Sequence, residues 1–234
     1  MRQNRFYLEG KFEGDILELT DLPIINQIKN VLRLKEGDFF SLFNGSGVEL
    51  KVKIKSIRSR AVEVSIVGRE KREESSPEVC LYLAILKKEN FELAVQKAVE
   101  AGVTQIIPII TERTIKLGLK IGRLKIIIKE ASEQSGRFFI PSLKEAITFS
   151  EAISQADCSD CLSIFCDFQE KNKNIDAKAK KKINIFVGPE GGWSTNEQEL
   201  AQLKGLLPYS LGEYVLRAET AAIVTTWLAV NKKL

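Results

Sequence analysis

Residues 183–197 read INIFVGPEGGWSTNE, in which an apolar run passes into a glycine-rich turn and then into the start of a helix. Glycines carry no Cβ, so the backbone of such a turn can approach a ligand closely. Ser194 and Glu197 have the S-x-x-E spacing of a capping box, which predicts where the following helix begins. The stretch therefore predicts a strand, a turn that binds a small molecule through its main chain, and a capped helix.

This turn does not match two common phosphate-binding signatures. It lacks the G-K-[ST] ending of a P-loop and the G-x-G-x-x-G spacing of a dinucleotide fold. An ordinary tight turn is the plain alternative, but residues 209–222, YSLGEYVLRAETAA, repeat the pattern. There, Leu211 and Gly212 end a short apolar run, and a long apolar helix opens at Arg217. Two such turns at strand ends predict one shared site.

Two charged residues open that second helix. Glu219 falls in the first turn, where a carboxylate suits the positive end of the helix dipole, and this is its ordinary explanation. Arg217 has no such explanation, because a cation at the same end is not favoured. Arg217 is therefore the stronger candidate for chemistry.

The first seventy residues read mostly as short strands, and a small β-barrel with a basic exterior fits them. Strands are expected over 5–8, 16–19, 38–43, 48–57 and 61–67, with one helix near 24–34. In VELKVKIK, residues 48–55, apolar and polar side chains alternate strictly, so the apolar ones are expected to face a core. Three lysines then line the outer face, although a plain solvated strand face explains each of them equally well.

Residues 68–77, GREKREESSP, are highly charged and end in serine and proline, which predicts a linker. Beyond it the pattern changes to alternation. Strands are expected over 79–86, 105–110, 162–168 and 183–187, and helices over 90–101, 121–135 and 150–156. Such alternation predicts a parallel sheet covered on both faces, with ligands bound at the carboxyl ends of the strands. The domains are accordingly placed at 1–70 and 71–234.

Composition removes several reaction classes. None of the 234 residues is histidine, so there is no Ser-His-Asp triad, Cys-His pair or H-E-x-x-H zinc site. The spacing Cys158-x-x-Cys161 suggests zinc, but no second pair or histidine completes a site, so no metal is expected. Disulfides are not expected either, and Cys80 and Cys166 lie in apolar runs as small hydrophobic residues.

No apolar run reaches the length of a membrane span, and the N-terminus lacks the apolar core of a signal peptide. The protein is therefore expected to stay in the cytoplasm. The net charge of +4 is too small to indicate a polyanionic partner by itself, so the distribution of charge matters more than its sum.

The segments GPEGGWS and LGEYVLRAETA together resemble the RsmE family, S-adenosylmethionine-dependent methyltransferases that modify uridine N3 in 16S ribosomal RNA. Three further blocks fit in order: NVLR at 30–33 followed by EGD at 36–38, QKAVEAGV at 96–103, and EASEQSGR at 130–137. The similarity covers nearly the whole chain. Two departures stand out. The family usually carries histidines where Asn26 and Gln27 stand, so those histidines are not essential to this member, and Trp193 replaces a usual phenylalanine.

The resemblance implies a fold that periodicity alone does not show. This is an α/β fold with a SPOUT-type parallel sheet and a C-terminal trefoil knot, preceded by a small PUA-like β-barrel. It also implies a PUA-like RNA-binding domain over 1–70, a methyltransferase domain with the cofactor site over 71–234, and a homodimer. The expected partner is 16S rRNA, with naked rRNA and the small ribosomal subunit both open as substrates.

The resemblance also assigns roles to individual residues. Arg217 is the expected catalytic residue, with Glu219 and Thr220 orienting it or taking part in proton transfer. S-adenosylmethionine is expected to contact Phe165, Cys166, Gly188, Pro189, Glu190, Gly191, Gly192, Leu211, Gly212 and Leu216. The expected RNA contacts come from the residues themselves: the basic exterior of the first seventy residues offers Arg5, Arg33, Lys51, Lys53 and Lys55, and the block at 130–137 offers Glu130, Gln134 and Arg137. If the helix persists, the last three share one face at i, i+4 and i+7, and a plain solvated face is the alternative.

Two other functions remain open. One is a related RNA methyltransferase that acts on a ribose 2′-OH or on guanine N1. The other is an RNA-binding protein of ribosome assembly that keeps the fold without catalysis. The intact turns and Arg217 argue against a pure binder, because binding alone has no need of a cofactor crevice.

Overall fold

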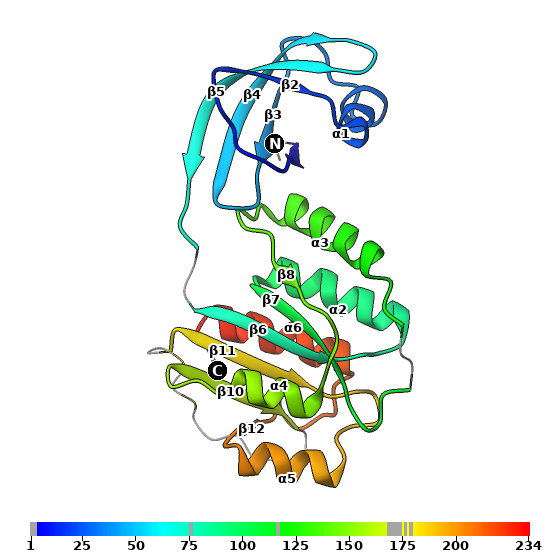
Figure 1. Cartoon of the computed structure of the whole chain (residues 1–234), viewed down its shortest axis with the longest axis vertical. Helices are drawn as coiled ribbons and strands as arrows, with labels where there is room; N and C mark the ends of the chain where they lie inside the picture. Colours follow the sequence, from blue (N-terminus) through cyan, green and yellow to red (C-terminus); the bar gives the residue numbers. More distant parts are fainter. Residues whose placement is uncertain (1–3, 75–76, 116–117, 168–174, 176, 178–179) are drawn as a thin grey trace. The chain divides into compact units, whose positions relative to one another are not determined.

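A computed structural model describes residues 4–74, 77–115, 118–167, 175, 177 and 180–234 (Figure 1). The chain forms two compact units. The N-terminal unit comprises residues 1–74 together with 132–140, and the C-terminal unit comprises 75–131 and 141–234. The return of residues 132–140 to the N-terminal unit is a feature that the sequence pattern did not indicate.

The N-terminal unit is built on a five-stranded sheet with the order β1-β3-β4-β5-β2. Its strands are β1 (Arg5–Tyr7), β2 (Ile16–Leu19), β3 (Phe39–Phe43), β4 (Val48–Ile57) and β5 (Val62–Lys71). β1 pairs with β3 in parallel, and the other pairings are antiparallel. All five strands contribute side chains to one hydrophobic core.

The alternation predicted for residues 48–55 is confirmed in β4. Leu50, Val52 and Ile54 are buried, whereas Lys51 and Lys53 are exposed on the opposite face. The sheet therefore has one face in the core and one basic outer face at β4, as the pattern of period two requires.

The helix expected near 24–34 is observed over 22–31, where it is divided into two segments of different type. The chain forms α1 (Leu22–Asn26) and then a π-helix, η1 (Gln27–Val31). Asp21 caps α1 by accepting a hydrogen bond from the Ile24 amide, and the Leu32 amide donates to the Gln27 carbonyl five residues back. Periodicity of 3.6 cannot reveal this wider turn, because it inserts one extra residue into the helix.

The linker expected over 68–77 is also partly wrong. β5 continues to Lys71, and its last residues pair in register with Val48–Lys51 at the start of β4. Charged side chains are tolerated here because both faces of this strand end are open to solvent. Residues 75 and 76 of the expected linker lie outside the described residues.

The C-terminal unit is built on a seven-stranded sheet in which every pairing is parallel, as predicted. Its strands are β6 (Glu78–Ala84), β7 (Gln105–Ile110), β8 (Ser142–Leu143), β9 (Ile147–Thr148), β10 (Cys161–Cys166), β11 (Lys182–Val187) and β12 (Leu207–Tyr209). The order is β12-β10-β11-β6-β7-β8, and β9 pairs with β7. The strand expected over 162–168 ends at Cys166, and residue 168 lies outside the described residues.

Helices cover both faces of this sheet. The helices packed on it are α2 (Lys88–Ala101), α4 (Phe149–Ala156), α5 (Thr195–Leu203) and α6 (Ala218–Val230), while α3 (Ile121–Ser135) begins in this unit and has its last residues, from Ser132 on, in the N-terminal unit. α4 and α5 share a core with alternate side chains of β6, such as Cys80 and Tyr82, while α6 packs against α2, β6 and β11. Figure 1 shows α4 and α6 on opposite sides of the sheet. None of the described helices is long and apolar enough to span a bilayer.

One pair of cysteines is bonded, contrary to the expectation that the chain has no disulfide. Cys158 and Cys161 form a disulfide, although none was expected. The physical reason is the turn that precedes β10, which brings the two Cα atoms to 5.4 Å, a spacing that suits a disulfide. Cys80 and Cys166 are free thiols in β6 and β10. Among the described residues, no three metal-ligating side chains gather in a cluster that could hold an ion.

Candidate functional site

Three parallel strands of the C-terminal unit end level with one another. Cys166 at the end of β10 pairs with Val187 at the end of β11 and with Tyr209 at the end of β12. The turns that follow β11 and β12 therefore begin at the same edge of the sheet. The structure thus brings together the two glycine-containing turns that the sequence singled out, at the edge where parallel sheets bind ligands.

The capping box predicted after the first turn is confirmed. Ser194 Oγ accepts a hydrogen bond from the Glu197 amide at 3.1 Å, and Glu197 Oε2 accepts one from the Ser194 amide at 2.9 Å. The other oxygen of Glu197 accepts from the Glu112 amide at 2.9 Å. One buried carboxylate therefore fixes both the start of α5 and the loop that follows β7.

Trp193 forms an aromatic wall between two strand ends. Its ring stacks on Phe165, with centroids 4.4 Å apart, and its Nε1–H donates to the Cys166 carbonyl oxygen at 2.9 Å. Gly188 has a packing reason to be glycine, because a Cβ there would lie 2.9 Å from Trp193 Cε2. The indole and the backbone of the first turn are therefore in close contact, with no room for a side chain at Gly188.

The rest of the first turn is held by residues that sequence reasoning missed. Arg113 Nη1 donates to the Gly191 carbonyl oxygen at 2.7 Å. Glu190 Oε1 accepts from the Lys87 amide at 3.1 Å. Arg113 and Lys87 follow β7 and β6 in the chain, and no local sequence signal connects either one with a turn about eighty to a hundred residues later. The turn is thus positioned by contacts from two neighbouring loops.

The second turn is open. Gly212 has a φ of +119°, which only glycine adopts readily, and no heavy atom lies within 4 Å of where its Cβ would stand. Ser210 Oγ donates to the Gly212 carbonyl oxygen at 3.1 Å and stabilises the turn from within. Leu211 is half-buried and Leu216 is more exposed. The turn offers main chain and apolar surface to a ligand, as a site of this kind requires.

Arg217 and Glu219 lie together at the start of α6. Arg217 Nη1 lies 3.9 Å from Glu219 Oε1, the Arg217 side chain is 83% exposed, and the Glu219 side chain is only 8% exposed. Glu219 Oε2 is buried and has no hydrogen-bond partner among the described residues. Leaving a buried carboxylate oxygen unpaired is costly, which points to a role beyond packing. Thr220 follows, half-buried, in the same helical turn.

The thiol of Cys166 forms part of the wall. Its Sγ lies 3.5 Å from Thr225 Oγ1 of α6. Burial raises the pKa of this thiol to about 11. The thiol is therefore neutral at physiological pH and lacks the thiolate character of a nucleophile.

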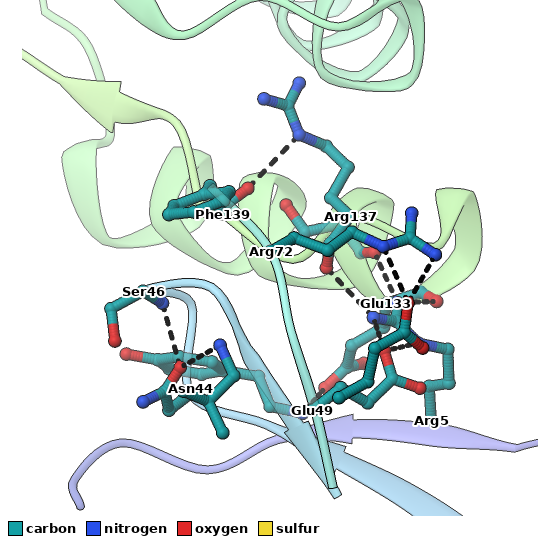
Figure 2. Close-up of polar contacts among 12 residues, drawn as sticks. Arg5, Asn44, Ser46, Glu49, Arg72, Glu133, Arg137 and Phe139 are labelled. Carbon is teal, nitrogen blue, oxygen red and sulfur yellow. Dashed lines mark hydrogen bonds and ion pairs between the residues drawn. The ribbon is translucent and has the colours of Figure 1, made fainter. Parts of the chain in front are cut away.

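Several candidate RNA-binding residues lie in the N-terminal unit. Arg5 forms an ion pair with Glu49 and donates to the carbonyl oxygens of Ser132, Glu133 and Arg137 (Figure 2). Its guanidinium thus neutralises a carboxylate and binds carbonyl groups at the C-terminal end of α3, where a cation is favoured. Arg5 therefore has a structural role in the N-terminal unit, which no local sequence pattern indicates.

The helical face expected for Glu130, Gln134 and Arg137 does not extend to the arginine. α3 ends at Ser135, and Gly136 turns the chain with a φ of +77°. Arg137 Nε donates to the Phe139 carbonyl oxygen at 3.2 Å, and burial lowers the pKa of its guanidinium to about 10. Glu130 and Gln134 remain exposed on the helix. Arg33, Lys51, Lys53 and Lys55 are exposed in the N-terminal unit.

Comparison with known proteins connects both units with one family. A model of an RNA methyltransferase domain matches residues 73–230, and a model of an RNA methyltransferase PUA domain matches residues 19–67. Ribosomal RNA small subunit methyltransferase E of Rickettsia conorii is 34% identical over 230 residues, which cover 95% of this chain and 93% of the relative. This chain belongs to the ribosomal RNA small subunit methyltransferase E (RsmE) family. The protein of the same name from Mesomycoplasma hyopneumoniae is 33% identical, with coverage of 94% and 95%.

Solved structures of similar proteins agree with this RsmE fold along nearly the full chain. The family member of Neisseria gonorrhoeae, bound to S-adenosyl methionine, has a TM-score of 0.88 and 30% identity, covering 96% of this chain and 95% of that one. A putative methyltransferase of Legionella pneumophila in complex with SAM also has a TM-score of 0.88 and 30% identity, with coverage of 98% and 97%. The predicted fold class, a parallel α/β sheet preceded by a PUA-like domain, is therefore confirmed.

Proposed function

We propose that this RsmE-family chain transfers a methyl group from S-adenosylmethionine to N3 of a uridine in 16S rRNA of the small ribosomal subunit. The main support is the geometry of one sheet edge, where three strands end level at Cys166, Val187 and Tyr209 and are followed by two turns. Arg217 and Glu219 lie together just after the second turn. The relatives named ribosomal RNA small subunit methyltransferase E, and the S-adenosyl methionine bound to the N. gonorrhoeae protein, support the proposal.

The residues at this edge fit a nucleoside cofactor bound largely through backbone. The proposed contacts are those expected from sequence: Phe165, Cys166, Gly188, Pro189, Glu190, Gly191, Gly192, Leu211, Gly212 and Leu216. Turns of low side-chain content leave amide and carbonyl groups for adenine edges, and the neutral Cys166 thiol adds apolar surface. When bound, S-adenosylmethionine supplies an electrophilic methyl group. The protein has to align the acceptor and manage its charge.

Two glycine substitutions separate binding from folding. At Gly191 an added Cβ meets only Arg113 atoms at 3.5 Å and beyond, which is ordinary contact, so Gly191→Val is compatible with the fold. At Gly188 an added Cβ meets the Trp193 ring at 2.9 Å, so Gly188→Ala disturbs the wall itself. We expect Gly191→Val to abolish cofactor binding in calorimetry while melting like the wild type. Unchanged affinity in Gly191→Val would refute the assignment of this turn.

Arg217 is proposed as the catalytic residue. Uridine N3 must lose its proton before or during attack, and the resulting negative charge spreads over the carbonyl oxygens of the ring. A guanidinium next to the reacting base stabilises that charge. The Arg217 side chain is 83% exposed, so it is accessible to a large RNA substrate, and Glu219 at 3.9 Å orients it. Glu219 or Thr220 then takes part in moving the proton.

The test of this role uses two replacements. We expect Arg217→Ala to lower the rate of methylation of rRNA by at least about a hundredfold, the scale seen when a charge-stabilising donor is removed. Arg217→Lys retains the charge without the planar fork and should recover part of the rate. Both variants should bind S-adenosylmethionine as the wild type does. A wild-type rate in Arg217→Ala would exclude this residue from catalysis.

The reaction product is tested by nucleoside analysis of rRNA. Loss of 3-methyluridine from the 16S rRNA of a strain lacking this protein supports the proposal. Loss of a ribose or guanine methylation indicates a related methyltransferase, and no loss indicates an RNA-binding assembly protein. Comparing methylation of naked 16S rRNA with that of small ribosomal subunits by purified protein identifies the physical substrate.

A homodimer is part of the proposal. α6 carries Val224, Trp227 and Leu228 on one side, where Val224 and Trp227 are 36% and 45% exposed. Nearby in sequence, Tyr214 and Val215 are 82% and 72% exposed. Exposed apolar side chains of this density are typical of a protein interface. Light scattering coupled to size exclusion tests the dimer. The trefoil knot implied by the family resemblance stays a prediction.

A further inference from the structure

An aromatic side chain flanked by two lysines lies on the outer face of the N-terminal sheet. Phe39 of β3 is 45% exposed, although phenylalanine is usually buried. The Nζ atoms of Lys51 and Lys53 lie 5.6 and 5.7 Å from the centroid of its ring. These distances are close to the outer limit for cation–π attraction, so the ammonium groups are not fixed on the ring.

The strand register explains why these three side chains meet. Phe39 pairs directly with Lys53 across β3 and β4, and Ser41 pairs with Lys51. Side chains two residues apart on a strand share a face, so Phe39 and Ser41 lie on one face, as do Lys51 and Lys53. The patch formed by Phe39, Lys51 and Lys53 is thus a direct consequence of pairing, within a single rigid sheet.

A pocket of about 440 Å³ is lined in part by Ser41, which pairs with Lys51 and stands two residues after Phe39 on the same face of β3. Its lining includes Gln27, Val31 and Leu32 from the π-helix and its end, Ser41 of β3, Glu49 of β4 and Gln134 of α3. The volume is in the range of small-ligand sites. Amide and hydroxyl groups stand beside apolar ones, which is the combination that a flat nucleobase with a polar edge requires.

The π-helix is what presents its side chains to this pocket. In a π-helix the hydrogen bond runs to the fifth residue, so Gln27, Val31 and Leu32 come to lie on one side. Val31 is 65% exposed and Leu32 is 38% exposed, an unusual state for two adjacent apolar residues. They form an apolar wall that no other described side chain covers completely.

The electrostatics of the pocket suit a nucleotide. Two acidic residues line it: Glu49, whose carboxylate is paired with Arg5, and Glu133, whose Oε1 accepts a hydrogen bond from the Tyr7 amide at 2.9 Å. The pairing reduces the repulsion that a bare carboxylate would exert on a phosphate. Just beyond, Lys51 and Lys53 continue along the same face of β4 and supply positive charge.

We infer that a single-stranded segment of RNA crosses the outer face of β3 and β4, with one base stacked on Phe39 and the neighbouring nucleotide in the pocket beside Gln27 and Val31. The step from Phe39 to Ser41 is about 6.6 Å, the scale of one extended nucleotide. Lys51 and Lys53 bind the phosphates. The inference rests on the proposed RNA substrate, and it adds that the N-terminal unit reads an unpaired strand in preference to a duplex.

The first experiment measures binding without methylation. Fluorescence anisotropy of the full-length protein is recorded with a labelled single-stranded oligoribonucleotide and with the matched duplex. We expect tighter binding of the single strand. Phe39→Ala should weaken it about tenfold or more, and Phe39→Trp should restore it, because base–aromatic stacking depends on the ring. Ile16→Ala, another exposed apolar residue 51% accessible on β2 at the far end of the sheet order, is the matched control.

Salt dependence separates stacking from charge. Phe39→Ala removes no cation, so the slope of log affinity against log salt should stay as in the wild type. Lys53→Gln should reduce that slope by about 0.7, the value for one phosphate contact on a single strand. Gln27→Leu keeps the volume of the side chain and should change the ranking of poly(U), poly(C) and poly(A), whereas Phe39→Ala weakens all three evenly.

The outcomes distinguish this inference from the proposed function. Wild-type single-strand affinity in Phe39→Ala, with 16S rRNA still methylated by the wild type, overturns the inference alone. Absence of methylation by the wild-type protein overturns the proposed function. The anisotropy measurements still test the inference in that case, because they do not depend on methylation. If the inference and the proposed function both hold, Phe39→Ala should raise KM for rRNA about tenfold and leave kcat within about twofold.

Discussion

Trp193 donates its indole N–H to the main-chain carbonyl oxygen of Cys166 across 2.9 Å. The bond connects the turn after β11 with the last residue of β10, and the same ring stacks on Phe165. One side chain therefore sets the spacing between two walls of the candidate cofactor crevice. A phenylalanine at this position can stack on Phe165 but cannot donate this hydrogen bond.

The first prediction concerns this bond. Trp193→Phe keeps an aromatic ring on Phe165 and removes the hydrogen bond, so the affinity for S-adenosylmethionine should fall about fivefold, equivalent to about 1 kcal/mol. Trp193→Leu removes the stacking as well, so its affinity for S-adenosylmethionine should be lower still. Isothermal calorimetry measures both. Equal affinity in wild type and Trp193→Phe would show that the bond does not shape the crevice.

The second prediction concerns the buried carboxylate of Glu219. Its Oε2 atom has no hydrogen-bond partner among the described residues, so the folded state carries an uncompensated desolvation cost. Glu219→Gln removes the charge at nearly constant shape and should stabilise the C-terminal unit by about 1 kcal/mol. The same change should lower the methylation rate, because Arg217 loses its partner. A variant that is both less stable and fully active would contradict this account.

Several elements of the fold could be predicted from local patterns in the sequence. The alternation in β4 and the capping box of Ser194 and Glu197 depend on near neighbours in the chain, and both are confirmed. The helix over 121–135 was also predicted with its observed bounds. These features follow from periodicity and backbone hydrogen bonding, which a short window of sequence contains.

What the sequence could not show depends on contacts between distant segments. Arg5 binds carbonyl groups of residues 132, 133 and 137, and only the folded chain brings these segments together. The support that Arg113 gives to Gly191 is of the same kind. The π-helix was not predicted, because one extra residue per turn shifts the periodicity of a helix without changing the types of residue in it. At the candidate site, the resemblance to the RsmE family indicates residues such as Arg217 that periodicity does not single out.

The third prediction concerns Arg33, which has a φ of +53° immediately after the π-helix. A non-glycine residue in this conformation is strained by about 1–2 kcal/mol. Arg33→Gly should therefore stabilise the N-terminal unit by roughly 1 kcal/mol, and Arg33→Ala should not, because it keeps the Cβ. Hydrogen exchange of β3 and β4 amides reports the stability of this unit.

Both substitutions at Arg33 remove the same charge, so they should weaken RNA binding alike and reduce its salt slope by about 0.7. A strained arginine retained at a binding surface is the pattern expected where function outweighs stability. RNA affinity unchanged in both variants would remove Arg33 from the interface, and equal stability of the two would show that the strain is absent.

The fourth prediction concerns alkaline pH and the buried thiol of Cys80. Burial raises the pKa of this thiol from 9.0 to about 12, with Glu78 adding to the rise and Lys182 opposing it. Between pH 9 and pH 12 the unfolded chain loses a proton that the folded chain retains. Stability is therefore complete below pH 9 and falls as pH rises, by up to about 1.4 kcal/mol per pH unit for this group.

Cys80→Val removes this contribution, so the variant should lose stability less steeply than the wild type above pH 9. Burial also raises the pKa of Cys166 and of Tyr82, and the charge of Cys80 adds to the rise at Tyr82. Cys80→Val therefore also reduces the Tyr82 shift, which makes the loss of stability less steep in the same direction. Trp193 and Trp227 both belong to the C-terminal unit, so tryptophan fluorescence during urea unfolding follows that unit alone. Parallel stability curves from pH 8 to pH 10.5 in wild type and Cys80→Val would show that the Cys80 thiol titrates at the same pH in the folded and unfolded chain.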